Sequence, residues 1–314
     1  MAERSVIVVA GPTASGKSGF AMGLAERFDG TIINADSMQV YRDLRILTAR
    51  PSQADEGRIP HLLFGDRDAT QAGSAADWAG AAHAALQSVI DAGRRPILVG
   101  GTGLYLKALM EGLAPIPEVP REFRGRAQAR RREIGDVAFH NELATRDPEV
   151  AARLHPGDSQ RVLRAWEVVE ATGRPLSDWQ NEPVITPDKS FRVIVIDPPR
   201  EELYRNCDSR FLDMIDAGAI DEVKTLAARA EAEGLDPALP IFKAIGYPSL
   251  SAHLRGEMPL DAAIVAAQQQ TRNYAKRQTT WLRHQLPGNE GEHPRIALLK
   301  YNYSNDDEVF SFMS

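Results

Sequence analysis

The chain has 314 residues, with 37 Lys and Arg against 43 Asp and Glu, so its formal net charge is −6. Hydrophobic residues make up 43% and charged residues 25% of the sequence, as in ordinary globular proteins, which excludes a wholly disordered chain. The negative net charge argues against a protein that coats nucleic acid regardless of sequence, although it is compatible with a local basic groove.

Cys207 is the only cysteine of the sequence, which excludes an internal disulfide and a cysteine-based zinc site. No apolar run approaches the roughly 20 residues that span a bilayer. The first apolar run, residues 6–10, is shorter than the roughly 7–15 residues of a signal-peptide core. We therefore expect a soluble, cytoplasmic protein.

Strand and helix patterns alternate along the sequence. Residues 5–10 are a β-branched run that predicts a buried parallel strand, and residues 18–28 have the apolar spacing of an amphipathic helix. Three further strands are predicted at residues 31–34, 96–100 and 191–197, and a helix at residues 75–92. This alternation predicts an α/β fold with a parallel sheet flanked by helices.

The eight residues after the first predicted strand match the P-loop template. They are Gly11, Pro12, Thr13, Ala14, Ser15, Gly16, Lys17 and Ser18. The N–H groups of such a loop converge on a phosphate, Lys17 neutralises phosphate oxygens, and the Ser18 hydroxyl can hold Mg²⁺. The alternative is a chance Gly-rich turn. We predict a P-loop NTPase-like sheet that binds a di- or triphosphate.

A P-loop alone does not say whether the phosphate is transferred, hydrolysed or discarded. The usual partner is an Asp at the end of a strand that helps to hold Mg²⁺. Asp197 stands at such a place, but it precedes two prolines and equally suits a strand-end turn. The sequence therefore gives an NTPase little support.

Polar residues follow the strands predicted at 31–34 and 96–100, at the edge where open α/β sheets bind ligands. Asp36 can accept a proton from a substrate, and Ser37 and Gln39 can bond a base edge; Asp36 is equally suited to cap a helix. Thr102 can donate to a leaving-group oxygen or, alternatively, close a tight turn.

The strand pattern disappears between residues 117 and 187, where Arg, Glu and Ala dominate. We predict a small all-helical insertion domain at residues 118–185, within a P-loop catalytic core formed by residues 1–117 and 186–314. After residue 197 the sequence is again largely helical, over 203–232 and 260–286. The acidic end, residues 304–314, is expected to form a loosely held tail.

Two segments carry residue types that suit nucleic acid. Gln160 can pair with adenine, and Arg161 and Arg164 suit phosphates or guanine edges, whereas solvated or ion-paired arginines are the alternative. Residues 271–283 contain four Lys and Arg and no acid, interleaved with aromatic residues. This pattern favours contact with nucleic-acid phosphates, or a helix whose basic face is solvated.

Taken together, five segments resemble the tRNA dimethylallyltransferase family in order and spacing over nearly the whole chain. They are residues 11–18, 34–42, 100–109, 155–164 and 272–283, with further support from residues 243–247. The run Asp-Ser-Met-Gln followed by Gly-Gly-Thr-Gly-Leu-Tyr is far more specific than the P-loop alone. The cysteines of the eukaryotic members' zinc finger are absent, so the chain resembles the bacterial form.

The resemblance implies transfer of the dimethylallyl group from dimethylallyl diphosphate to N6 of the adenosine 3′-adjacent to the anticodon. The tRNAs are those that read codons starting with U, diphosphate is released, and Mg²⁺ is the cofactor. It implies neither a membrane nor an obligate protein partner.

The resemblance also implies roles for individual residues. Asp36 is the expected general base, and Thr102 is expected near the bridging oxygen and the target amine. Arg210 stands where the family has an arginine directed at the diphosphate, beside the P-loop residues. The residues expected to contact tRNA are Asp36, Ser37, Met38, Gln39, Thr102, Arg124, Gln160, Arg161, Val162, Leu163, Arg164, Lys276 and Arg277.

Three alternatives compete with this interpretation. An isopentenyltransferase acting on free adenine nucleotides shares the P-loop and Asp36, but needs no Arg-rich insertion. A P-loop nucleotide kinase or NTPase predicts phosphoryl transfer from ATP or ATP hydrolysis. A nucleic-acid-binding module with a vestigial P-loop requires an intact Gly-Lys-Ser sequence to be idle.

Overall fold

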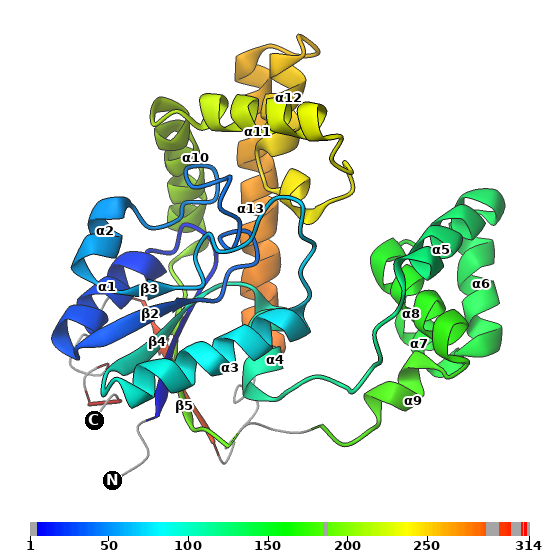
Figure 1. Ribbon diagram of the computed structural model, residues 1–314, viewed down its shortest axis with the longest axis horizontal. Helices are drawn as coiled ribbons and strands as arrows, with labels where there is room; N and C mark the ends of the chain where they lie inside the picture. Colours follow the sequence, from blue (N-terminus) through cyan, green and yellow to red (C-terminus); the bar gives the residue numbers. More distant parts are fainter. Residues whose placement is uncertain (1–4, 185–187, 287–294, 303–308, 310, 313–314) are drawn as a thin grey trace. The chain divides into compact units, whose positions relative to one another are not determined.

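The computed structural model describes residues 5–184, 188–286, 295–302, 309, 311 and 312. It divides the chain into two units, one formed by Met1–Met110 with Pro187–Ser314 and the other by Glu111–Thr186 (Figure 1). The loose tail expected at residues 304–314 lies almost wholly outside the described residues.

The first unit is built on a six-stranded parallel sheet with the strand order β3-β2-β4-β1-β5-β6. The strands are β1 (Val6–Ala10), β2 (Gly30–Asn34), β3 (His61–Leu62), β4 (Arg95–Gly100), β5 (Phe191–Ile196) and β6 (Ile296–Tyr301). The four strands predicted from the sequence are confirmed. The other two carried no clear pattern, because β3 has two residues and β6 is buried mainly at its ends.

The register brings the carboxyl ends of the central strands to one edge. Ala10 of β1 pairs with Gly100 of β4, and Asn34 of β2 pairs with Val99. The chain leaves β1 toward β2 but continues from β4 toward β5, so the connections diverge at the β4-β1 boundary. Open α/β sheets bind their ligands outside such a point.

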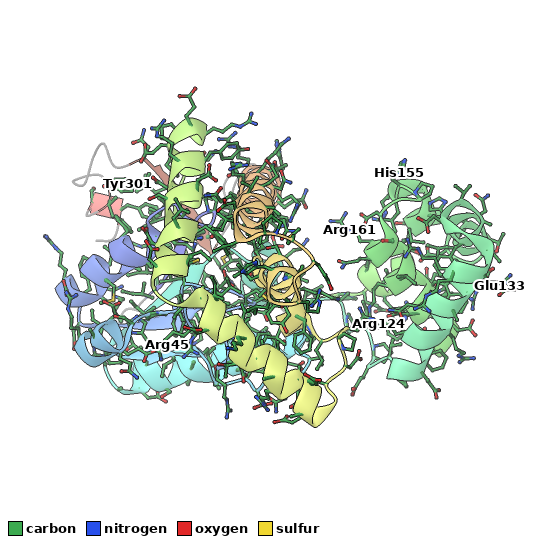
Figure 2. The ribbon with its side chains drawn as sticks, turned by 90° about the horizontal axis from the view of Figure 1, so that it is seen from above. Arg45, Arg124, Glu133, His155, Arg161 and Tyr301 are labelled. Carbon is green, nitrogen blue, oxygen red and sulfur yellow. The ribbon has the colours of Figure 1, made fainter. Side chains whose placement is uncertain are left out.

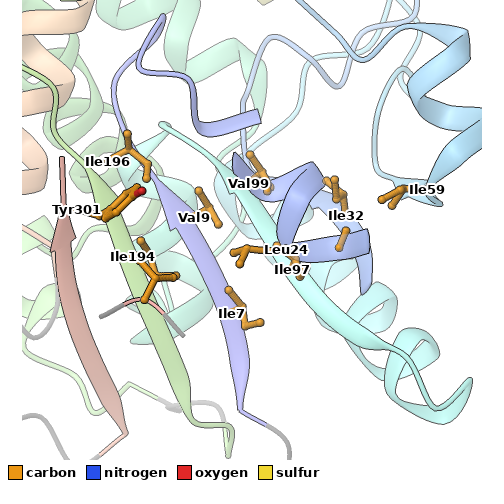
Figure 3. Close-up of a cluster of buried hydrophobic side chains, with 13 residues drawn as sticks. Ile7, Val9, Leu24, Ile32, Ile59, Ile97, Val99, Ile194, Ile196 and Tyr301 are labelled. Atoms are coloured by element: carbon orange, nitrogen blue, oxygen red, sulfur yellow. The ribbon is translucent and has the colours of Figure 1, made fainter. Parts of the chain in front are cut away.

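Helix α1 (Lys17–Arg27) covers one face of the sheet. Alternate strand residues point to this face, so Ile7 and Ile97 lie in one buried cluster with Leu24 of α1 (Figure 3). The short helix α2 (Gln53–Arg58) follows β2. The packing of α1 on the sheet fixes the N-terminus of α1 at the carboxyl end of β1.

Helices α3 (Ala75–Asp91) and α4 (Gly103–Met110) pack on the opposite face. The connection from β3 to β4 crosses the sheet in the opposite direction to that from β1 to β2, so a right-handed crossover places its helix on the other face. Ser74 begins α3 with a capping box shared with Asp77. The buried Trp78 donates its indole N–H to the Asn34 carbonyl at 3.0 Å, which ties α3 to the end of β2.

The remaining helices of this unit follow β5. The helical stretch predicted at 203–232 is two helices, α10 (Arg200–Asp216) and α11 (Ala219–Glu233), because the chain turns at Gly218, where φ is 101°. The other elements are the 3₁₀ helix η1 (Pro240–Lys243), α12 (Tyr247–Leu254) and α13 (Leu260–His284). Helix α13 confirms the helix predicted at 260–286 and packs against α10, α12 and α4. No helix among the described residues is long and apolar enough to cross a membrane.

Every regular element described in the second unit is a helix, as predicted. They are α5 (Arg121–Ile134), α6 (Asp136–Arg146), α7 (Pro148–Arg153), α8 (Ser159–Thr172) and α9 (Leu176–Gln180). Phe139, Leu143 and Trp166 lie in its buried core.

A buried carboxylate joins two helices of the second unit. Asp147 caps α7 by accepting the Val150 N–H at 3.1 Å. It also accepts the Ser177 N–H at 3.0 Å and the Ser177 hydroxyl at 2.8 Å, from the first turn of α9. This one side chain therefore satisfies three donors inside the core.

We predict that Asp147→Ala destabilises the second unit by about 3 kcal/mol, because it leaves buried donors without an acceptor. Urea unfolding gives the total effect, and hydrogen exchange of the α7 to α9 peptides locates it. Asp178→Ala removes an exposed carboxylate 3.8 Å from Arg174 and is the control, with an expected cost of about 0.5 kcal/mol or less. Unchanged exchange in the Asp147 variant would contradict the assignment.

Candidate active site

The P-loop connects β1 to α1 at the carboxyl edge of the sheet. Gly16 has φ of 85°, a left-handed conformation that glycine adopts readily, and α1 begins at the next residue. The N-terminal N–H groups of α1 and its dipole favour an anion here. Ser18 lies exposed in the first turn, where its hydroxyl is accessible to a bound ion.

Lys17 is a desolvated cation beside this loop. Its Nζ donates to the Pro12 carbonyl at 3.2 Å. Burial lowers the pKa of Lys17 to about 8, with the charge of Asp36 acting in the opposite direction and that of Arg210 lowering the pKa further. A bound anion favours the charged form, so it raises the pKa of Lys17 and holds its proton more firmly.

Helix α10 supplies a second cation to the loop. The Arg210 guanidinium donates to the Thr13 hydroxyl, and burial lowers the pKa of Arg210. Cys207, one turn earlier, is buried with its Sγ 4.0 Å from the Thr13 carbonyl oxygen. Burial raises the pKa of this thiol, so Cys207 stays neutral and acts as an apolar wall.

Asp36 sits in a turn directly after β2. The Asn34 side chain holds this turn, accepting the Asp36 N–H at 2.8 Å and donating to the Asp36 carbonyl at 3.0 Å. Asp36 Oδ1 accepts the Met38 N–H at 2.9 Å. The alternative that Asp36 caps a helix is wrong, because residues 37–40 form turns and no helix starts there.

Thr102 is bonded to the Asp36 turn as well as to the start of α4, where its carbonyl accepts the Tyr105 N–H at 2.9 Å. Its Oγ1 accepts the Ser37 N–H at 3.0 Å, and its own N–H donates to the Ala35 carbonyl at 3.3 Å. The two hydroxyl oxygens of Thr102 and Ser37 are 3.4 Å apart. The loops after β2 and β4 therefore behave as one structural piece.

Gln39 is engaged within the protein. Its amide nitrogen donates to the Thr48 carbonyl at 2.8 Å and to the Ala49 carbonyl at 2.9 Å. Glu222 of α11 holds the same segment from the other side, accepting the N–H groups of Ile46 at 2.9 Å and Leu47 at 2.8 Å. Gln39 was expected to bond a base edge. In this structure its amide nitrogen instead bonds the protein backbone, and together with Glu222 it holds residues 45–49.

A cavity of about 70 Å³ lies between these pieces. Its polar lining comprises Thr13, Asp36, Arg210 and Tyr274. Its remaining walls are mainly apolar and comprise Met38, Leu47, Thr48, Cys207, Phe211, Met214, Ala244, Ile245 and Thr271. Charge at one part of the cavity and an apolar wall at another suit an amphiphilic ligand.

Several of these walls had no local sequence signal. Leu47, Phe211 and Met214 read as ordinary core residues, and only the cavity shows their second role. Ala244 and Ile245 belong to the segment 243–247 that supports the family resemblance, and the structure places them in the cavity wall.

Helix α13 has two distinct faces. Tyr274 lines the cavity, and burial raises the pKa of its hydroxyl. Lys276 and Arg277 are exposed, with the Arg277 guanidinium 5.7 Å from the centre of the Tyr274 ring. The aromatic residues of this basic stretch face inward, while Lys276 and Arg277 remain accessible. Contact of these cations with nucleic-acid phosphates stays a prediction.

Asp197, the possible Mg²⁺ ligand after β5, pairs with Arg283 at 3.0 Å. No group of three or more acidic, His or Cys side chains with metal-binding geometry occurs among the described residues. Mg²⁺ often takes one or two protein ligands and completes its shell with phosphate oxygens and water. The exposed Ser18 hydroxyl at the P-loop fits that pattern.

In the second unit, the candidate residues on α5 and α8 differ in accessibility. Arg124, Gln160, Arg161 and Arg164 are exposed, and Figure 2 shows Arg124 and Arg161 on one side of the unit, with Glu133 on the opposite side. Arg161 is paired with Asp158 at 3.5 Å and Arg164 with Glu167 at 3.8 Å. The first pair lies at the start of α8 and the second near its middle.

Two residues of this stretch cannot offer a free side chain. Val162 is 1% exposed and lies in the core of the second unit, and Leu163 packs partly against that core. The contact expected of Val162 is therefore wrong for its side chain, because helical spacing turns it inward between its exposed neighbours.

Comparisons with known proteins find similar sequences over most of the chain. The family model for IPP transferase matches residues 39–285. A tRNA dimethylallyltransferase of Rhodospirillum centenum is 53% identical over 317 residues, covering 98% of this chain and 99% of that protein. A tRNA dimethylallyltransferase of Rhodospirillum rubrum is 53% identical over 283 residues, covering 90% and 86%.

Two solved structures are similar along almost the full chain. A eukaryotic dimethylallyltransferase acting on tRNA has a TM-score of 0.80 and 29% identity, covering 97% of this chain and 77% of that one. A full-length tRNA isopentenylpyrophosphate transferase from Bacillus halodurans has a TM-score of 0.65 and 29% identity, covering 98% and 94%.

The lowered pKa of Lys17 predicts a pH-dependent affinity for diphosphates. A bound diphosphate favours protonated Lys17, so above the free pKa of about 8 binding must take up a proton and weakens by up to about tenfold per pH unit. Calorimetric titration with 3-methylbutyl diphosphate, which is saturated and unreactive, measures this. Lys17→Arg stays protonated and is the control; a wild-type affinity equal at pH 7 and pH 9.5 would contradict the prediction.

Proposed function

The chain belongs to the tRNA dimethylallyltransferase family of IPP transferases, and from the site above we propose that it transfers a dimethylallyl group from dimethylallyl diphosphate to tRNA. The acceptor is N6 of the adenosine 3′-adjacent to the anticodon, in tRNAs that read codons starting with U. Diphosphate is released, and a tRNA substrate implies work in the cytoplasm. The observation that carries the proposal is one cavity lined by the P-loop, by Arg210 and by Asp36, with an apolar wall beside them.

The leaving group is the part of the reaction that needs most stabilisation. The bond between C1 of the dimethylallyl group and the bridging oxygen breaks, and its electron pair departs with the diphosphate. The N–H groups of the P-loop and the charges of Lys17 and Arg210 act on that developing charge. The Ser18 hydroxyl would hold Mg²⁺, which would supply additional positive charge at the leaving group.

The new bond joins C1 to N6 of adenine, and the amine proton moves to the Asp36 carboxylate. The Met38 N–H bonds one oxygen of that carboxylate and so orients Asp36 toward the amine. The Thr102 hydroxyl accepts the Ser37 N–H and also bonds the Tyr274 hydroxyl. Its own proton is directed at the Ser37 hydroxyl and would have to turn toward the bridging oxygen or the amine. Its 3.4 Å contact with the Ser37 hydroxyl is long and readily exchanged.

The apolar wall suits the five-carbon chain of the donor. Met38, Leu47, Phe211 and Ile245 exclude water from the carbon that is attacked, which protects it from hydrolysis. A phosphate donor without an alkyl chain would leave this wall unused. The cavity therefore favours alkyl transfer over phosphoryl transfer.

The target adenine has to leave its stack to reach such a site, as base-modifying enzymes require. Exposed cations are available for the tRNA backbone, Lys276 and Arg277 in the first unit and Arg124, Arg161 and Arg164 in the second. Gln160 adds an exposed amide that can bond a base. A free adenine nucleotide needs none of these, and a kinase would need Asp197, which pairs with Arg283.

The direct test combines the protein with Mg²⁺ and radiolabelled dimethylallyl diphosphate, and offers either unmodified tRNA or AMP as acceptor. Label in tRNA alone supports the proposal. Label in AMP would favour the free-nucleotide enzyme, and transfer of label from γ-labelled ATP would favour the kinase.

We predict that Asp36→Ala lowers turnover by about 10² to 10⁴, the usual contribution of a general base, while the affinity for tRNA changes little. Single-turnover kinetics with saturating tRNA measure the chemical step. Asp91→Asn, which alters an exposed carboxylate on α3, is the control and should react normally. Normal turnover of the Asp36 variant would remove this residue from the mechanism.

Arg161→Ala should weaken tRNA binding and reduce the salt dependence of the binding constant by about 0.7 in log–log slope, because one phosphate contact is lost. Filter binding at several salt concentrations gives the slope. Arg153→Ala, an exposed arginine of the same unit paired with Glu149, is the control. An unchanged slope for Arg161→Ala would show that this residue contacts no phosphate.

A further inference from the structure

Gln278 of α13 is a buried amide that bonds two loops of the site at once. Its Oε1 accepts the Thr13 N–H at 2.8 Å. Its Nε2 donates to the Gly101 carbonyl at 2.9 Å, and the side chain belongs to a residue only 5% exposed. The two partners come from the P-loop and from the loop after β4.

These two bonds need an amide of this length. A backbone N–H only donates and a backbone carbonyl only accepts, so the bridging group must offer both an acceptor and a donor. Glutamate could serve Thr13 but would face the Gly101 carbonyl with a second acceptor. Methionine has a similar length and serves neither partner.

Two glycines let α13 approach the loop after β4 closely. A Cβ on Gly101 would lie 2.3 Å from Nε2 of Gln278 and 2.6 Å from the Gly11 carbonyl oxygen. One turn further along α13, the Trp281 ring packs on Gly103, where a Cβ would lie 2.3 Å from the ring. The inward face of α13 therefore holds both glycine-rich loops.

The bond from Gln278 to Gly101 is connected to Asp36 through Thr102. Thr102 follows Gly101 and is bonded to Ser37 and Ala35, the two neighbours of Asp36. Thr13, at the other end of the bridge, is the residue that Arg210 holds. Gln278 thus links the group that holds the diphosphate to the group that handles the amine.

We propose that Gln278 is a positioning residue that sets the spacing between the diphosphate-holding P-loop and the Thr102–Asp36 pair. This inference rests on the proposed function. It separates Gln278 from its exposed neighbours Lys276 and Arg277, which were expected to contact tRNA. A change of about 1 Å in that spacing can slow a reaction by roughly 10²-fold while each substrate still binds.

The test compares Gln278→Met with Gln270→Met, a change at an exposed glutamine of the same helix. Three quantities are measured on the full chain: kcat for transfer to unmodified tRNA, the Kd for tRNA, and the Kd for 3-methylbutyl diphosphate. We expect kcat of Gln278→Met to fall about 10- to 100-fold, with both Kd values within about threefold of wild type. The Gln270 variant should match wild type in all three.

Each other result overturns the inference. A kcat within twofold of wild type shows that the bridge does not position the loops. A parallel loss of diphosphate affinity shows that Gln278 only supports the P-loop, and a parallel loss of tRNA affinity places it in the tRNA surface. If Gln278→Met does not fold, Gln278→Asn, an amide one methylene shorter, takes its place with the same outcomes. If the wild-type chain transfers no label to tRNA, the proposed function itself is contradicted, and this inference fails with it.

Discussion

The parallel pairing of β1, β4 and β2 is the constraint on which the site depends. Because these strands run in one direction and are paired in register, the P-loop, the Asp36 turn and the Thr102 loop all emerge at one edge. None of the three loops contains a complete site. Their hydrogen bonds to one another, made through Thr102 and Gln278, turn three separate connections into a single cavity wall.

The charged residues around the cavity suit the two groups that the proposed reaction must bind, the diphosphate and the amine proton. Two cations, Lys17 and Arg210, are partly deprived of water, and burial lowers the pKa of both. A site of this kind gains most when an anion arrives or develops. Asp36 lines the same cavity, and the Met38 N–H holds its carboxylate. The cations are thus left for the leaving group and the carboxylate for the amine proton.

The sequence predicted those parts of the fold and site that have short, local causes. The P-loop, Asp36 and Thr102 each follow a β-branched strand, and the edge they share is a consequence of parallel pairing. Leu47, Phe211 and Ile245 could not be predicted as cavity walls, since each reads as a core residue until distant helices bring them together. Helical spacing could have predicted that Val162 is buried, because it lies on the opposite side of α8 from its exposed neighbours.

The central claim is that the diphosphate departs whole while an alkyl group moves. Dimethylallyl diphosphate with oxygen-18 at the bridging position tests it directly, because alkyl transfer breaks the bond from carbon to oxygen and phosphoryl transfer breaks the bond from oxygen to phosphorus. The account predicts that all of the label appears in the released diphosphate, with a five-carbon group on tRNA. Label retained in dimethylallyl alcohol, with a diphosphoryl group on the acceptor, would contradict it.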